Sequence, residues 1–139
     1  AAFGAELQRA LRQICWPAEL RARGGLFSGG LRVAVGALGG GYTSRRPHAS
    51  TGRADYFGTI VNRAARIAAS AHGGQVLLGG EDPLAGSEAA SAPLGPRRLG
   101  AFTLKGIDSP MVLSELAVPD ELGRLEAFPE PRTKGRVSD

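Results

Sequence analysis

The chain has 139 residues, of which 42% are hydrophobic and 22% charged, a length and balance that suit one folded domain and argue against wholesale disorder. Its apolar runs are all shorter than the roughly 20 residues needed to cross a bilayer, so no membrane segment is expected. A single cysteine and two histidines exclude an internal disulfide framework and a cysteine-built zinc site. The net charge of +4, carried mainly by arginine, permits nucleic-acid, nucleotide or acidic-membrane partners without choosing among them.

The first half of the chain predicts two helices, one strand and a long loop. Phe3, Leu7 and Leu11 fall at helical spacing, so a helix is expected over residues 3–15, followed by a short helix from Pro17. Alternating apolar residues over 31–38 predict a strand. Residues 39–54 are expected to form a polar loop. Its glycines are not followed by a helix or by Gly-Lys-Ser/Thr, so the dinucleotide and P-loop motifs do not apply.

The second half predicts one strong helix and three short strands. An apolar stripe indicates a helix over 58–72, and the expected strands cover residues 75–78, 99–104 and 111–116. An alanine-rich stretch at 81–92 predicts a weak helix, and the polar, proline-punctuated residues 119–139 predict a linker or tail. Helices and strands mix without strict alternation, which favours an α+β domain with a mostly antiparallel sheet.

The most informative segment is Asp55-Tyr-Phe-Gly-Thr-Ile-Val-Asn62-Arg-Ala-Ala-Arg66. Asn62 and Arg66 are four residues apart, so they share one helix face, one turn apart. An amide beside a guanidinium is suited to hold a phosphorylated ligand, because arginine offers a fixed, positively charged donor fork. The alternative that stays open is structural: Asp55 caps the helix and Arg66 is a solvated charge.

This segment resembles the signature of class III nucleotidyl cyclases, the adenylate/guanylate cyclase catalytic domains. Further stretches agree in chain order: the helix ending at Trp16-Pro17, the strand over 31–36, Gly73-Gly-Gln-Val-Leu-Leu78, and the block from Leu99 to Pro110 that contains Lys105-Gly106. The resemblance covers residues 1–118 and implies the C-terminal portion of such a domain. The implied fold is a partial ferredoxin-like cyclase fold, mostly antiparallel, with helices packed on one face, and 119–139 follow as a linker or tail.

The resemblance implies roles for four residues. In the family the ribose 3′-oxygen attacks the α-phosphorus and pyrophosphate leaves, so positioning and positive charge carry the catalysis. Asn62 matches the residue that orients the ribose, and Arg66 the one that stabilises the transition-state phosphate. Asp55 matches the residue that reads the base, where an acidic side chain favours ATP, and Lys105 matches the lysine that holds the terminal phosphates. For Lys105 the alternative is a solvated turn lysine.

The chain departs from the family in two places. The central strand runs Gly36-Ala-Leu-Gly39, where the family usually has Gly-x-His-x-Gly. The two aspartates that bind Mg²⁺ or Mn²⁺ in the family, and the lysine that partners the base-reading aspartate, have no match before Leu31. We therefore expect the metal ligands to lie outside this chain. Family active sites form at a dimer interface, so the implied partners are a nucleoside triphosphate and a second cyclase domain, in a homodimer or heterodimer.

Three functional hypotheses follow. The first is the base- and phosphate-binding half of an enzyme that converts ATP to cyclic AMP and pyrophosphate, inactive alone, with a guanylate cyclase as a variant. The second is an inactive cyclase-like dimerisation or regulatory domain. The third is a nucleic-acid binder, which rests on basic charge alone; Arg45, Arg46 and Arg53 lack the interleaved aromatic residues of such a surface, so no nucleic-acid partner is expected. The family also implies a cytoplasmic domain, free or carried by a membrane-anchored parent protein.

Overall fold

The computed structural model describes the chain except residues 1, 23–29, 85–94, 120–122, 124 and 138–139. The helices are α1 (Ala2–Gln13), α2 (Ala18–Ala22) and α3 (Thr59–Ser70). The strands are β1 (Val35–Leu38), β2 (Ser44–Pro47), β3 (Ala54–Phe57), β4 (Val76–Gly79), β5 (Pro96–Thr103), β6 (Met111–Leu116) and β7 (Gly135–Val137). Most of the expected weak helix at 81–92 lies outside the described residues. None of the helices in the described part of the chain has the length and apolar character to span a membrane.

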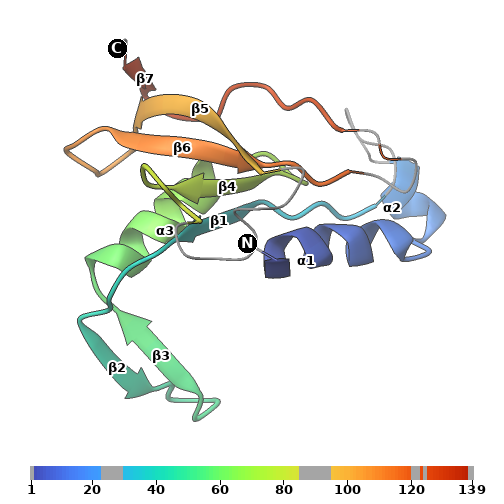
Figure 1. Ribbon diagram of the computed structural model, residues 1–139. Helices are drawn as coiled ribbons and strands as arrows, with labels where there is room; N and C mark the ends of the chain where they lie inside the picture. Colours follow the sequence, from blue (N-terminus) through green and yellow to red (C-terminus); the bar gives the residue numbers. More distant parts are fainter. Residues whose placement is uncertain (1, 23–29, 85–94, 120–122, 124, 138–139) are drawn as a thin grey trace.

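The described strands form one five-stranded sheet and one separate hairpin (Figure 1). The sheet has the order β1-β4-β6-β5-β7, in which β1 and β4 are parallel and the other neighbours antiparallel. The expected α+β class and mostly antiparallel sheet are therefore confirmed. The predicted strand over 31–38 is shorter than expected and begins at Val35.

The two long helices lie on opposite faces of the sheet, so the expectation of helices on one face is wrong. Neighbouring residues of a strand point to opposite faces. Leu77 packs in a buried cluster with Ile67 of α3, whereas Val76 and Leu78 pack in a second cluster that includes Ala5 of α1. The sheet is therefore a middle layer with a separate apolar core on each side.

α3 lies unusually close to β1, and glycine makes this approach possible. A Cβ placed on Gly36 would stand 2.6 Å from the Cα of Ala68, a distance that real Cβ atoms do not show. A strand glycine facing a helix alanine thus brings the two backbones into direct contact. This packing fixes α3, and with it the side chains of its outer face.

Two sequence predictions need correction beyond the core. The predicted loop over 39–54 contains β2, which pairs with β3 as an antiparallel hairpin that projects away from the main sheet (Figure 1). The predicted tail over 119–139 includes β7, which pairs with β5, and Pro131 is buried. The domain boundary at Val118 stays a prediction, but the described residues beyond it pack on the domain.

Candidate functional site

The outer face of α3 forms one wall of an open cleft. The helix begins after Gly58, its N-cap, and carries Asn62 and Arg66 one turn apart. Both side chains are exposed. Ile67, on the other side of the helix, packs in the buried core cluster against the sheet, because an amphipathic helix buries one stripe and leaves the other in solvent. The sequence therefore places the amide and the guanidinium side by side at the surface.

The turn between β5 and β6 forms the other wall. Residues Gly106–Ser109 line a cleft of about 790 Å³ together with Asn62 and Arg66. Ile107 anchors this turn, because it packs against the core cluster and its N–H donates a hydrogen bond to the carbonyl of Leu104 at 3.2 Å. The turn is therefore held against α3 rather than extending freely into solvent.

Lys105 and Asp55 lie outside the described lining of this cleft. Lys105 is exposed and immediately precedes Gly106, so it stands at the edge of the cleft. Asp55 is half-buried on β3, within the projecting hairpin, where its cross-strand partner is Arg46. The structure thus brings Asn62 and Arg66 together with the turn that follows Lys105, and leaves Asp55 on a neighbouring element.

The alternative interpretation of Asp55, that its side chain caps the helix, is wrong. Gly58, not Asp55, is the N-cap of α3, and no side chain caps the helix by a hydrogen bond. Asp55 lies three residues earlier, paired within the hairpin. Its carboxylate is therefore not needed to start the helix, and another role is open to it.

Four further polar residues line the cleft that the sequence reasoning did not single out as site residues: Thr59, Arg63, Asp108 and Ser109. Thr59 and Arg63 could have been found from helical spacing, since positions three or four residues from Asn62 or Arg66 share their face. Asp108 and Ser109 belong to the turn, and no periodic signal places a turn residue opposite a helix. The cleft lining carries two guanidinium groups and, among its described residues, one carboxylate, so its charge favours an anion.

The described residues do not suit a resident divalent metal. No group of three or more His, Cys, Asp or Glu side chains that could hold a metal ion occurs in the described part of the chain. Mg²⁺ and Mn²⁺ prefer carboxylate, carbonyl and water oxygen ligands, and a two-metal site needs carboxylates that bridge both ions. Asp108 alone does not make such a site.

The hairpin β2–β3 carries exposed aromatic and basic side chains next to α3. Tyr42 and Tyr56 pack edge to face, with ring centroids 4.9 Å apart, and the Arg45 guanidinium lies 6.0 Å from the Tyr56 ring centroid. Tyr56 and Phe57 are both close to half exposed. The hairpin projects from the main sheet with these aromatic side chains exposed, which suits a surface that meets another molecule.

The chain is similar to adenylate cyclases in sequence and in structure. An adenylate cyclase of Schizosaccharomyces pombe is 29% identical to the chain in an alignment of 164 residues, and this alignment covers 96% of the chain. Two solved structures of adenylate cyclases from Trypanosoma brucei in their monomeric state match it with TM-scores of 0.62 and 0.64, at 29% and 25% identity, and cover 96% and 99% of the chain. No protein-family model matches.

The chain spans a small part of its curated relative and somewhat more than half of the solved chains. It covers 10% of the length of the yeast protein and 58% and 59% of the trypanosome chains. The similarity over nearly the whole of this chain therefore concerns one portion of each of those proteins.

Proposed function

We propose that the chain is part of a class III nucleotidyl cyclase catalytic domain, as its similarity to adenylate cyclases supports, and that its cleft between α3 and the β5–β6 turn binds the nucleoside triphosphate that is cyclised. The observation that carries this proposal is the placement of Asn62 and Arg66 opposite the turn that follows Lys105, in one open cleft. An open, arginine-lined cleft suits a triphosphate, because charge-assisted hydrogen bonds to phosphate oxygens are strong.

The proposed reaction needs little covalent chemistry from the protein. A bond forms between the ribose 3′-oxygen and the α-phosphorus, the bond from that phosphorus to the bridging oxygen of pyrophosphate breaks, and the 3′-hydroxyl proton leaves to solvent. Negative charge grows on the phosphoryl oxygens and on the leaving group. Arg66 stabilises that charge, and the Asn62 amide orients the ribose so that attack occurs in line. Lys105, at the edge of the cleft, holds the terminal phosphates.

Asp55 is proposed to select adenine. Its carboxylate accepts a hydrogen bond from the adenine amino group, whereas guanine presents a carbonyl oxygen that an ionised carboxylate repels. Asp55 does not line the cleft, but its strand β3 contacts α3, so the proposal requires the base to extend from the cleft towards the hairpin. The substrate proposed is therefore ATP and the product cyclic AMP, with GTP as the alternative.

The proposed site is one half of an active site between two cyclase domains. Asn62 and Arg66 are exposed, and the hairpin beside them presents Tyr56 and Phe57 to solvent. The described residues offer no ligand set for the metal ions that the family uses, so these ions would be held by a partner domain or by sequence outside the chain. We expect the chain alone to be inactive as a cyclase.

The lack of a carboxylate cluster among the described residues also supports a second candidate, an inactive cyclase-like domain that dimerises and regulates. Nucleotide binding separates the two. Backbone amide shifts of the 139-residue chain should be followed while a non-hydrolysable ATP analogue is added. The proposal expects saturable shifts along Thr59–Arg66 and Lys105–Ser109 that Arg66→Ala abolishes and Arg98→Ala, on β5, leaves intact. Absence of shifts in these segments would favour the regulatory candidate.

A further inference from the structure

Arg63 lines the α3 cleft, but the proposed function gives it no role. It follows Asn62 directly on α3, and it is half-buried, whereas Arg66 is exposed. Arg63 and Arg66 are three residues apart, so their side chains leave neighbouring positions on the helix surface. Both line the same cleft. One wall of the cleft therefore presents two guanidinium groups about one helical turn apart.

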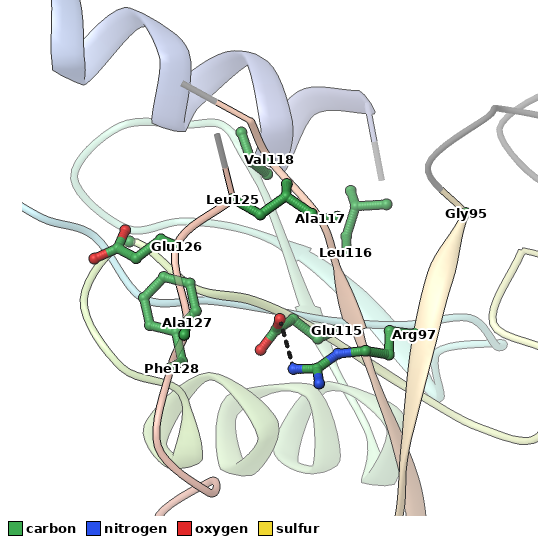
Figure 2. A pocket seen from close by; sticks show the side chains of 11 residues that line it. Gly95, Arg97, Glu115, Leu116, Ala117, Val118, Leu125, Glu126, Ala127 and Phe128 are labelled. Atoms are coloured by element: carbon green, nitrogen blue, oxygen red, sulfur yellow. Dashed lines mark hydrogen bonds and ion pairs between the residues drawn. The ribbon is translucent and has the colours of Figure 1, made fainter. Parts of the chain in front are cut away.

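The two cleft arginines lack the ion pairs that several other arginines make. On β5, the Nη2 atom of Arg97 lies 3.2 Å from Oε1 of Glu115 (Figure 2). Further described arginines pair with glutamates in the same way: Arg9, Arg12, Arg32, Arg98 and Arg136. Arg63 and Arg66 form no ion pair with any residue that the structure describes. Within the described chain, both guanidinium forks are therefore available to a ligand.

The charges of α3 make this arrangement unfavourable without a ligand. Like charges three residues apart on a helix repel each other, and Thr59–Ser70 contains both arginines and no acidic residue. The N-terminal end of the helix adds partial positive charge, which no acidic side chain in the first turn offsets. Asp108, across the cleft, is the one carboxylate among the described lining residues, and it pairs with neither arginine. An anion bound at both arginines relieves this repulsion.

We propose that Arg63 is a further phosphate-binding residue of the cleft and that, together with Arg66, it holds a diphosphate group without a divalent cation. This inference rests on the proposed function, to which it adds a residue that contacts the pyrophosphate as it leaves. A guanidinium presents its donors in a planar fork that fits two oxygens of one phosphoryl group. Two forks about one turn apart therefore suit two linked phosphoryl groups. Because Arg63 is half-buried, its interaction with phosphate is screened less than that of a fully exposed arginine.

Titration with two inorganic anions tests the proposal on the full 139-residue chain. Pyrophosphate and orthophosphate are added separately, in buffer stripped of divalent metal and at about 0.15 M salt, which screens long-range attraction to the net positive chain. Backbone amide shifts of Thr59–Arg66 and Lys105–Ser109 report binding. We expect saturable shifts with pyrophosphate and binding weaker by about tenfold or more with orthophosphate, because a single phosphoryl group engages one fork. No saturable binding of pyrophosphate, or equal affinity for the two anions, would overturn the proposal.

Three variants assign the preference to Arg63. Arg63→Gln removes the charge but keeps a long polar side chain, so it should weaken pyrophosphate binding by about tenfold or more and change orthophosphate binding little. Arg63→Lys keeps the charge without the fork and should recover part of the affinity. Arg53→Ala removes the same charge from the exposed turn of the hairpin, and it should bind both anions as the unaltered chain does. Equal affinity of Arg63→Gln and Arg53→Ala for pyrophosphate would overturn the role of Arg63.

A parallel titration with the non-hydrolysable ATP analogue separates this inference from the proposed function. If the analogue binds in the cleft but pyrophosphate does not, or if Arg63→Gln binds pyrophosphate normally, the assignment of Arg63 is wrong and the proposed function stands. If neither ligand shifts the cleft residues, both fail. Thermal unfolding of Arg63→Gln checks that any loss of binding is not a loss of the fold.

Discussion

Gly106, in the turn after β5, lies directly beside the guanidinium of Arg66 on α3: a Cβ placed on Gly106 would stand 3.9 Å from both Nε and Nη2 of Arg66. The two residues belong to separate motifs in the sequence, one on a helix and one in a turn. Their proximity brings Lys105 to the edge of the cleft that Asn62 and Arg66 line. The proposed triphosphate site depends on this meeting of two elements.

Replacing Arg66 should remove catalysis while the fold is kept. In an assembled catalytic site that contains this chain, Arg66→Ala should lower turnover by about 10²–10³-fold, as for the loss of one donor that stabilises developing charge. Arg66 is exposed, so its loss should change the free energy of unfolding by less than about 0.5 kcal/mol. Steady-state kinetics and urea unfolding measure the two effects. Arg98→Ala, an exposed β5 arginine away from the cleft, is the matched control. Full turnover in Arg66→Ala would contradict its assigned role.

Replacing Asp55 should change which nucleotide is used. Asp55→Ala removes the acceptor for the adenine amino group and the repulsion of the guanine carbonyl, so the ratio of kcat/KM for ATP over GTP should fall by about tenfold or more. Asp55→Asn is the informative companion, because its amide can also donate to guanine. An unchanged ratio in both variants would mean that Asp55 does not read the base. The measurement is competition between the two nucleotides in the assembled site.

Alanine at Gly106 should strain the turn that forms one wall of the cleft. Gly106 has φ +75°, a region that disfavours residues with a Cβ by about 1–2 kcal/mol. Gly106→Ala should therefore lower the free energy of unfolding by that amount and weaken nucleotide binding as the turn shifts from Arg66. Gly41→Ala is the control, because a Cβ there meets nothing within 4 Å and the backbone needs no positive φ. Equal stability of the two variants would argue against a strained turn.

Removing residues 119–139 should destabilise the domain. If this segment were instead a free tail, its removal would leave the free energy of unfolding unchanged. The described part of this segment contributes β7, the buried Pro131 and a hydrogen bond from the Lys134 N–H to the carbonyl of Thr103 at 3.0 Å. Several lost hydrogen bonds at about 1 kcal/mol each predict a loss of at least about 2 kcal/mol. Urea unfolding of the chain ending at Val118 tests this, and unchanged stability would support the tail.

A matched pair at Arg132 isolates one contact of that segment. The bond from Arg132 to the carbonyl of Ser70 is made by the backbone N–H, so Arg132→Ala keeps it, while Arg132→Pro removes the donor. Ser70 is buried at the end of α3, so its carbonyl would lose a partner that water replaces poorly. The proline variant alone should lose about 1–3 kcal/mol of stability. Equal losses in both variants would assign the effect to the arginine side chain.

The sequence predicted best the elements that have a strong period. The amphipathic stripe of α3 and the helical face shared by Asn62 and Arg66 depend on local spacing, which the structure keeps. The strands expected at 99–104 and 111–116 are present as β5 and β6. The hairpin was missed because β2 reads Ser-Arg-Arg-Pro, with polar residues on both faces and no buried side to reveal it. Pairing with β3, rather than local propensity, makes this segment a strand.

Relations between distant segments could not be predicted in the same way. The second apolar core, against α1, requires that Val76 and Val35 face away from Leu77, which depends on the register of β1 and β4. The role of residues 125–137 depends on single main-chain hydrogen bonds and on ion pairs of Glu126, which composition does not reveal. Asp108 joined the cleft because a turn happens to face a helix.

The most direct test of the proposed function is complementation. The 139-residue chain is mixed with a cyclase domain that keeps its own metal-binding aspartates but has alanine at the positions that match Asn62 and Arg66. Formation of cyclic AMP and pyrophosphate from ATP is then measured. The account predicts that neither protein alone forms product, that the mixture forms both products in equal amounts, and that Arg66→Ala in the chain abolishes this activity. A mixture that stays inactive, or one that is equally active with Arg66→Ala, would contradict it.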